Sequence, residues 1–393
     1  MKLTGVIGPS YTLQSKNAAS ERCLGWYPER LESDQGTNTW ILQPVPGIFP
    51  FCAMPGQQGR GCFAQDGRAW AVVDDGLYEV FKRGQSGAVI RRGTVAFDGT
   101  PVTFASAADE STGALPWNNQ MLLPSAGGLS LYNLVTNVLT DISAVTDAPV
   151  PAAMCGYTDG YAIVLLRVTG NFQISGFVPN IAAVVPDFSR WNSLDAEQVG
   201  FNSDKVLSMV IDHREVWLFG STRSGVWRNV GGAGNPFQPI GGAVLEQGII
   251  APFSACRFDN TIAWLGGSAE SGAGRAFRAN GYTPQRISTH AVETIWQSYP
   301  RIDDAVGWRY DEDGHEFYML DFPSGETSWG YDAASGMWHE RAVWNPDYTR
   351  FEPQIPRFHM YAFGTHLVQD RQSGALYEQS RGLTAYTVLH PTP

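Results

Sequence analysis

The strongest constraint in this sequence is a recurring hairpin pattern. Seven segments have the same form: an apolar or aromatic run, a turn that contains glycine, and a second apolar run. Such a pattern predicts a β-hairpin. The segments start roughly 40 to 55 residues apart, close to the ~50-residue repeat of kelch-type propellers. They are residues 69–81, 121–134, 161–174, 216–227, 262–277, 317–332 and 366–378.

A single hairpin is only marginally stable in water because one of its faces stays wet. Stacking hairpin-based sheets radially buries both faces and leaves only short edges. The repeat therefore predicts an all-β chain that folds as a β-propeller of six or seven blades. We expect an N-terminal extended arm and strand over residues 1–50, the propeller over 51–380 and a C-terminal tail over 381–393.

Two local patterns refine this prediction. Residues 329–338, WGYDAASGMW, contain a Tyr-Asp pair, a Ser-Gly turn and a following Trp, which is typical of the inner hairpin of a kelch blade. Helical periodicity is weak along the chain, and only residues 194–199 fit a short helical turn. We therefore expect helices to be a minor part of the fold.

Composition agrees with an all-β protein. The chain has 43 Gly and 24 Pro for turns, and its 13 Trp, 15 Tyr and 20 Phe favour strands. With 38 acidic and 27 basic residues, the formal net charge is −11, which argues against a surface built to neutralise nucleic-acid phosphates. The N-terminus shows no signal-peptide pattern, and no apolar run has the length of a membrane helix. We expect synthesis and folding in the cytosol.

The five cysteines form an odd set without CxxC spacing. This pattern gives little support to a disulfide framework or a zinc site. We expect Cys23, Cys52, Cys62, Cys155 and Cys256 to be buried or incidental thiols.

Other candidates for chemistry are weak in sequence. Residues 310–317, YDEDGHEF, begin like a calcium loop but place Phe322 where a bidentate Glu is needed, so an acidic hairpin turn is favoured. The glycine-rich runs 230–236 and 266–277 lack the ending of a phosphate loop, so their glycines are assigned to turns. His339 has no second histidine at metal-ligand spacing. We expect no catalytic site, no cofactor and no metal.

The sequence Asp212-His213-Arg214-Glu215 has two interpretations. In a hairpin, Asp212 and Arg214 are turn and strand-start residues. In a catalytic pair, His213 is a general base oriented by Asp212. Because adjacent residues on a strand face opposite sides, we expect these two side chains to point apart. The hairpin is the favoured interpretation.

Several blocks together resemble one family, the packaged-DNA stabilization or tail-nozzle proteins of short-tailed bacteriophages. Residues 16–29, KNAASERCLGWYPE, and 40–48, WILQPVPGI, are similar to the family's opening. Residues 187–249 are similar to its longest block, and 262–293 to a block that ends R-I-S-T-x-A-x-E. The resemblance runs, with gaps, from about residue 16 to about residue 377. The motif positions are Trp191, Asn192, Asp204, Asp212, His213, Arg214, Glu215, Val216, Trp217, Phe219, Gly220, Trp227, Arg286, Ser288 and Glu293.

The resemblance implies a structural protein of the virion tail with no enzymatic activity. Its copies are expected to form a hexameric ring, with twelve subunits as the alternative, that extends the DNA channel below the portal and adaptor and helps to retain packaged DNA. Implied partners are other copies of the chain, the adaptor–portal complex, and distal tail, fibre or spike proteins, with DNA passing through unbound. Assembly is expected in the host cytoplasm. Family members usually have a longer C-terminal portion, and the resemblance leaves open whether this chain has the family's full distal tip or is a shortened member.

An acidic ring fits this role because carboxylates that line a conduit repel phosphate. Two alternatives from other classes remain open. One is a propeller glycosidase or lyase that acts on host envelope polysaccharide through an axial acid such as Asp311. The other is a glycan-binding propeller that uses exposed tryptophans.

Two features have a structural and an interface interpretation. Tryptophans are expected in the core between blades or at interfaces; those concerned are Trp191, Trp227, Trp296, Trp308 and Trp344. The arm over residues 1–48 is either a segment that orders on docking against a neighbour or a frayed terminus.

Overall fold

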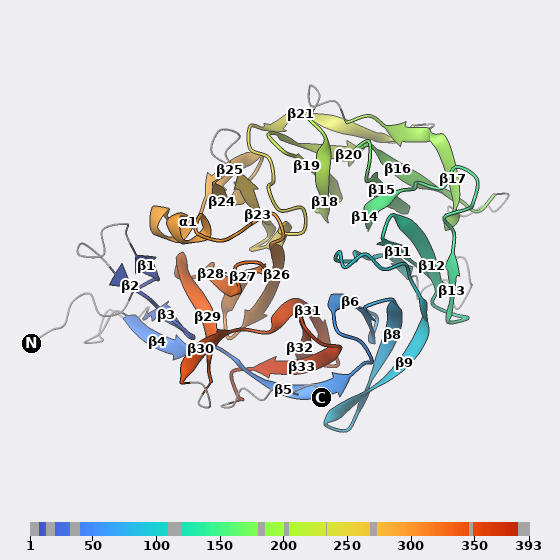
Figure 1. The fold of residues 1–393 in the computed structure, drawn as a ribbon. Coiled ribbons are helices and arrows are strands. Elements are labelled where there is room, and N and C mark those ends of the chain that lie inside the picture. Colours follow the sequence, from blue (N-terminus) through green and yellow to red (C-terminus); the bar gives the residue numbers. More distant parts are fainter. Residues whose placement is uncertain are drawn as a thin grey trace, which may run out of the picture. The chain divides into compact units, whose positions relative to one another are not determined.

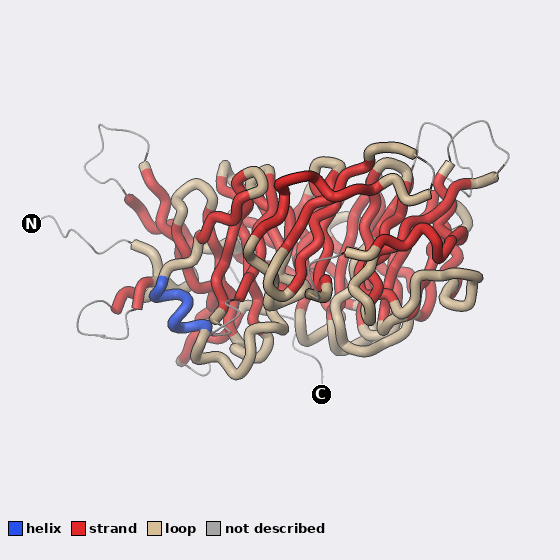
Figure 2. The backbone as a smooth tube through the Cα atoms, turned by 90° about the horizontal axis from the view of Figure 1, so that it is seen from above, coloured by secondary structure: helices blue, strands red, loops and turns tan. Residues whose placement is uncertain are grey.

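The computed structural model of the chain describes residues 8–12, 20–31, 40–108, 119–179, 185–199, 204–232, 234–267, 273–345 and 349–383. Within them the backbone is almost wholly β-strand (Figure 1, Figure 2). Apart from two short strand pairs, the described strands form seven antiparallel sheets, and in each the strands lie side by side in an up-and-down order. Seven such sheets are the blades of a β-propeller. The predicted all-β propeller is therefore confirmed, with seven blades.

The chain divides into two compact units. The first, called the 52–249 unit, comprises Cys52–Ile249 and Arg371–Ala375. It holds four sheets. Their strands, in sheet order, are β6 (Gly59–Gln65), β7 (Arg68–Val73), β8 (Gly76–Arg83) and β9 (Ser86–Thr94); β10 (Ala105–Ala108), β11 (Asn119–Ser125), β12 (Gly128–Asn133) and β13 (Val138–Asp141); β14 (Ala152–Thr158), β15 (Tyr161–Leu166), β16 (Phe172–Phe177) and β17 (Pro186–Glu197); and β18 (Val206–Asp212), β19 (Glu215–Gly220), β20 (Ser224–Asn229) and β21 (Phe237–Leu245).

The second, called the 250–370 unit, comprises Met1–Phe51, Ile250–Asp370 and Leu376–Pro393. Its sheets, in order, are β22 (Cys256–Phe258), β23 (Thr261–Gly267), β24 (Gly274–Asn280) and β25 (Thr283–Arg286); β26 (Val306–Glu312), β27 (His315–Phe322), β28 (Thr327–Asp332), β29 (Met337–Asn345) and β30 (Arg350–Pro353); and β31 (Pro356–Ala362), β32 (Thr365–Asp370), β33 (Ala375–Ser380) and β5 (Gly47–Ala53). The remaining elements are helix α1 (His290–Trp296) and the strand pairs β1 (Tyr11–Thr12) with β2 (Ser20–Glu21) and β3 (Trp26–Arg30) with β4 (Trp40–Pro44).

The seven predicted hairpins are all present, and each supplies the second and third strands of its sheet. These strands are the most buried, because apolar residues on both of their faces pack against neighbouring sheets. Between the first two sheets of the 52–249 unit, for example, Trp70 and Leu77 pack with Met121 and Tyr132. The recurring hairpin is therefore the core of every blade.

Two local predictions were wrong. Residues 329–338 are not an inner hairpin: they form β28 and β29, the third and fourth strands of their sheet. Residues 194–199 are not helical, because the first four of them belong to strand β17. The helix in the described residues is instead α1, which begins after Thr289, whose hydroxyl accepts a hydrogen bond from the Val292 N–H. Its seven residues are too few for periodicity to predict it.

The turn predictions were right. His213 and Arg214 have φ values of 47° and 64°, which a two-residue hairpin turn of type I′ requires. Asp313 and Gly314, with φ values of 52° and 83°, form the same kind of two-residue turn between β26 and β27. The Val230 N–H donates to the Pro236 carbonyl at 3.0 Å where β20 turns into β21. The second glycine-rich run, 266–277, lies partly outside the described residues.

The described part of the arm packs on the chain's own sheet β26–β30. Leu24 forms a parallel bridge with Glu340, and the Gly25 N–H donates to the Glu340 carbonyl at 3.1 Å. The Arg22 guanidinium binds the Glu340 carboxylate at 2.6 and 2.7 Å. Residues 47–53, on both sides of the expected arm boundary, form β5, which lies beside β33 as the fourth strand of the last sheet. The tail beyond residue 383 lies outside the described residues.

The expected burial of the tryptophans is confirmed for four of the five. Trp191, Trp227, Trp296 and Trp308 are at most 8% exposed, whereas the side chain of Trp344 lies outside the described residues. The five cysteines are free thiols, buried or half-buried, as expected. No helix in the described ranges has the length and apolar character needed to cross a bilayer.

We predict that Gly307→Ala destabilises the 250–370 unit. A Cβ at Gly307 would lie 2.0 Å from the Ser254 carbonyl oxygen, and the Gly307 N–H already donates to the Phe253 carbonyl at 2.8 Å. Because backbone lies on both sides of this contact, the strand must shift, at a cost of about 1–3 kcal/mol. Chemical denaturation measures the loss.

The matched control is Gly241→Ala, also in a strand, where a Cβ meets nothing within 4 Å. It should change the free energy of unfolding by less than about 1 kcal/mol. Equal stability of the two variants would contradict the close approach at Gly307.

Candidate functional site

The family-motif positions lie at three places in the structure: on strand β17, in the sheet β18–β21, and between β25 and helix α1. A fourth place, a cluster of buried polar side chains in the 250–370 unit, was not predicted from the sequence. Each is described in turn.

On β17 the motif residues build a bulge. Trp191 is buried in a cluster with Leu122 and Phe188, and the Asn192 side-chain oxygen accepts the Leu194 N–H at 3.0 Å. Pairing with β16 is interrupted, because Trp191 pairs with Ser175 and Ala196 with Gln173. Residues 192–195, which we call the β17 bulge, therefore project from the strand, and Leu194 is 87% exposed.

In the sheet β18–β21 the motif residues are mostly core. Val216 and Phe219 are fully buried, and Trp217 and Trp227 nearly so. At Gly220 a Cβ would lie 2.7 Å from the Asp204 carboxylate. That carboxylate accepts hydrogen bonds from the residue 221–223 N–H groups and two hydroxyls. Although burial opposes the change, the hydrogen bonds from Ser221 and its neighbours lower the pKa of Asp204.

The expectation that Asp212 and His213 point apart was wrong. His213 Nδ1 lies 2.7 Å from Asp212 Oδ2, because His213 is a turn residue with positive φ and the alternation of a strand does not apply to it. Glu215 begins β19 opposite Asp212. Arg214 donates to the Asp159 carboxylate at 2.5 Å. Asp159 lies on the turn between β14 and β15, in the neighbouring sheet β14–β17. The DHRE turn thus fastens two sheets together.

Arg286, Ser288 and Glu293 are brought together around one buried carboxylate. Glu293 is 5% exposed; it accepts hydrogen bonds from Arg286 Nε and Nη2 and from the Ser288 hydroxyl. Ser288 Oγ in turn accepts the Ala276 N–H at 3.0 Å. The last motif block therefore ties helix α1 to the sheet β22–β25. We call these three residues the helix latch.

We predict that Glu293→Ala destabilises the chain by about 3 kcal/mol, because it leaves the Arg286 charge and the Ser288 hydroxyl without their buried partner. Thermal or denaturant unfolding measures the loss. The control is Asp303→Ala, which breaks the ion pair of Asp303 with Arg301, where both side chains are more than half exposed. That change should be within about 1 kcal/mol, and a similar loss in both variants would contradict the role of the latch.

A buried polar core, missed by sequence analysis, lies in the 250–370 unit. It comprises Tyr27 of β3, Tyr310 of β26, His315 of β27, Asp332 of β28, and His339 and Arg341 of β29. His315 Nδ1 lies 3.0 Å from Asp332 Oδ2. Arg341 Nε donates to His339 Nε2 at 2.8 Å, and another Arg341 nitrogen donates to the Tyr310 hydroxyl.

These contacts fix the charge state of the core. Because His339 Nε2 accepts from Arg341, the imidazole is neutral with its proton on Nδ1. Burial, with Arg341 and His315 nearby, holds the pKa of His339 well below its ordinary value. The hydrogen bond to Asp332 raises the pKa of His315. Arg341 also lies over the rings of Tyr310 and Phe317, at 5.5 and 5.0 Å.

A second histidine pair adjoins this core. His359 Nε2 and His366 Nδ1 are 3.0 Å apart, and His359 stacks on Trp308. Burial, with His366 and Arg309 nearby, lowers the pKa of His359 to about 3. The same-face spacing of His339 with Arg341, two residues apart on a strand, was the signal available in the sequence.

We predict that stability falls as the pH drops below 6.5. The folded-state pKa values of His339 and His359 are depressed, so the stability they contribute is present above the unfolded value of about 6.5 and is lost as protons bind the unfolded chain. Each contributes a slope of up to about 1.4 kcal/mol per pH unit. His315, whose pKa is raised, keeps its contribution throughout this range and loses it only at higher pH.

Urea denaturation between pH 7 and pH 5 measures this slope. This pH interval lies above the range where most carboxylates titrate, so the histidines dominate the change. His359→Gln should reduce the slope. A chain equally stable at pH 7 and pH 5 would contradict the prediction.

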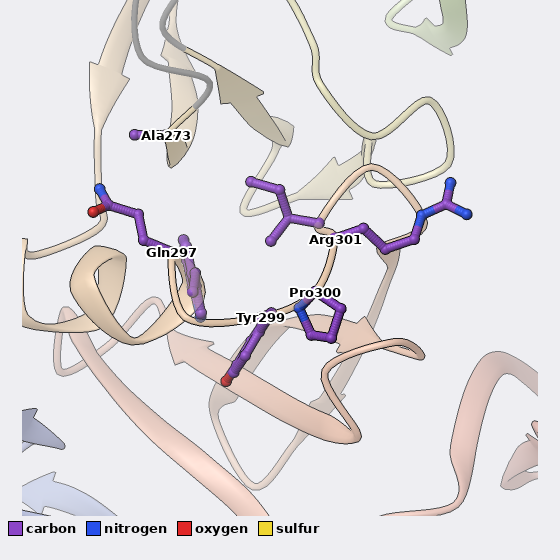
Figure 3. A pocket seen from close by; sticks show the side chains of 7 residues that line it. Ala273, Gln297, Tyr299, Pro300 and Arg301 are labelled. Carbon is purple, nitrogen blue, oxygen red and sulfur yellow. The ribbon is translucent and has the colours of Figure 1, made fainter.

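A pocket of about 420 Å³ lies at the end of α1 (Figure 3). Its lining residues are Ala273, Trp296, Gln297, Tyr299, Pro300, Arg301 and Ile302. The Tyr299 hydroxyl accepts the Trp329 indole N–H at 3.0 Å. In Figure 3 the Arg301 side chain extends away from Gln297 and Tyr299, and it forms an ion pair with Asp303. None of the described residues that line the pocket is an Asp or a Glu, so they do not supply the pair of acids that glycoside hydrolysis requires.

The acid named for the alternative hydrolase, Asp311, is 71% exposed and binds Arg309 at 3.4 Å, away from this pocket's lining. Across the described ranges, no three His, Cys, Asp or Glu side chains gather as metal ligands would. The thiols have raised pKa values because they are buried, to about 11 for Cys23 and about 12 for Cys52 and Cys155. The polar residues of these sites therefore bind one another and hold segments together.

Comparison with known proteins found one matching family and several similar solved structures. The family described as "Bacteriophage P22 Gp10, beta-propeller" matches residues 31–381. No curated protein sequence matches the chain. The extracellular domain of the one-component system BT4673 from B. thetaiotaomicron is 10% identical, with a TM-score of 0.51 over 84% of this chain and 39% of that one. YCF48 from Cyanidioschyzon merolae is 9% identical, with a TM-score of 0.48 over 85% and 98%. The first likeness shows a shared fold alone, and the chain spans well under half of that structure.

Proposed function

The chain belongs to the Bacteriophage P22 Gp10 β-propeller family, and from that premise we propose that its copies form a ring in the virion tail. The ring extends the DNA channel below the portal and adaptor and helps to retain the packaged genome. The observation that carries the proposal is the match over residues 31–381 of the 393-residue chain. Membership makes the chain a structural phage protein; the ring, the tail position and DNA retention are the proposal.

The charge of the chain supports a conduit for DNA. Each copy carries a net charge of −11, so a ring of copies concentrates negative charge around its opening. Carboxylates repel phosphate, and DNA passes such a surface without sticking to it. Retention then comes from constriction and from contacts between rings.

The site geometry supports a mechanical role. The DHRE turn and the buried polar core join segments that are distant in sequence, since Arg214 binds Asp159 and the Tyr27 ring contacts the His315 ring. Directional contacts of this kind fix the relative positions of strands. Closed cyclic symmetry then repeats each subunit contact around the ring, so a modest interface becomes collectively strong.

We predict that phage particles assembled without this chain package DNA but lose it. The measurement is the fraction of DNA-filled particles by electron microscopy, with the nuclease-accessible DNA quantified in the same preparation. Adding purified chain to freshly assembled particles should restore retention.

Antibody labelling of complete particles tests the position. Label at the tail vertex below the head is expected. Particles that keep their DNA without the chain, or label confined to the head shell or the fibre tips, would overturn the proposal.

A further inference from the structure

The β3–β4 hairpin presents an apolar face to solvent. In its register Trp26 lies opposite Pro44, and Pro28 lies opposite Leu42, so these side chains share one face. Trp26 is 47% exposed and Leu42 is 38% exposed. Pro44 is exposed as well, whereas Pro28 is buried. Aromatic residues such as Trp26 are enriched in interface cores.

The other face of the hairpin is fixed inward. Tyr27 is fully buried, and its ring contacts those of His315 and Phe317 at 5.1 Å. Gln43 donates to Glu29 at 2.6 Å and accepts from Arg381 at 2.9 Å. Because these contacts hold the hairpin against its unit, the apolar face cannot turn inward.

One cation accompanies this face. Arg30 lies opposite Trp40 in the register, on the same side as Trp26, and it is exposed. Among the described residues it has no ion-pair partner. We call Trp26, Arg30, Leu42 and Pro44 the hairpin face.

The β17 bulge has the complementary character. Leu194 is the most exposed large hydrophobic side chain of the described residues, at 87%. Asp195 follows it directly and Glu197 lies three residues further along the same strand, and both are half-buried. Neither forms an ion pair within the described ranges. The bulge is held rigidly, because the Asn192 carbonyl accepts from Gln173 at 3.1 Å and the Asp195 carbonyl from Asn235 at 2.9 Å.

We propose that the hairpin face of one copy docks on the β17 bulge of a second copy. Leu194 packs against Trp26 and Leu42, and Arg30 pairs with the carboxylates of Asp195 and Glu197. The two surfaces differ, so each copy carries one of each and the contact is head-to-tail. A contact of this type forms a ring when the rotation between successive copies closes. The inference rests on the proposed ring and names its subunit contact. The inference also assigns a role to the Trp191-Asn192 motif, because these residues shape the bulge on which the second copy docks.

Cysteine cross-linking tests the contact directly. Trp26→Cys and Leu194→Cys are prepared as separate full-length chains, mixed, and oxidised mildly. A disulfide-linked pair that forms only in the mixture is expected, because the two positions meet between copies. The native thiols give little background, since they are buried or half-buried. Val138→Cys, 53% exposed in the same unit as Leu194, replaces Leu194→Cys as the control.

Self-association gives a second measurement. Trp26→Ala with Leu42→Ala should weaken it at least about tenfold in sedimentation velocity, as removal of a central aromatic does. Ile90→Ala, at a position 45% exposed, is the control and should have no effect. Arg30→Glu and Asp195→Arg should each weaken association, and the two together should recover part of it. Circular dichroism melting confirms that each variant is folded.

The outcomes separate the inference from the proposed function. A ring that forms with unchanged affinity in the Trp26→Ala, Leu42→Ala variant, without the mixed disulfide, overturns the inference and leaves the function standing. A variant that assembles normally but no longer binds the adaptor overturns it too, since the hairpin face then docks on the adaptor. A chain that never associates, alone or with its tail partners, overturns the ring itself.

Discussion

The structure depends on one packing constraint: the second strand of each sheet carries buried apolar residues on both faces. Ala71 and Val72 of β7 are adjacent, face opposite sides, and are both fully buried; Ile163 and Val164 of β15 repeat the pattern. Burying such side chains is worth about 1.5–3 kcal/mol for each large one, but only if a neighbouring sheet covers each face. The hairpin therefore recurs, because each sheet needs others of its kind.

The same constraint explains how the last sheet is completed. Strands β31–β33 come from the end of the described chain, and their fourth partner is β5, from near its beginning. The hairpin β3–β4 comes just before β5 in sequence and is held inward by Tyr27. Packing thus decides which face of that hairpin stays exposed. Two buried charged groups show how such groups are accommodated: Glu293 binds Arg286, and Arg341 binds the neutral imidazole of His339.

Prediction from sequence succeeded where the signal was local. Each hairpin lies within one short segment, so its apolar runs and turn residues can be read directly, and the DHRE and DEDG turns followed from the same rules. It failed at β17, where an Asn192 side-chain contact makes a bulge that resembles a helical turn in sequence. It also failed for Asp212 and His213, because a turn residue does not follow the alternation of a strand. The grouping of Arg286 and Ser288 around Glu293 was not predicted.

The sequence by itself determined the all-β class, the number of hairpins and the family. The spacing of the hairpins, their turn residues and the order of the family motifs are all local features of the sequence. Tertiary structure alone decided which strand completes the last sheet, which histidines meet in the buried polar core, and that Leu194 and Trp26 face solvent. The physical reason is that burial and charge pairing depend on neighbours brought together in space. His315 and Arg341, which share a core with Tyr27, are some 300 residues from it along the chain, and no local pattern records that distance.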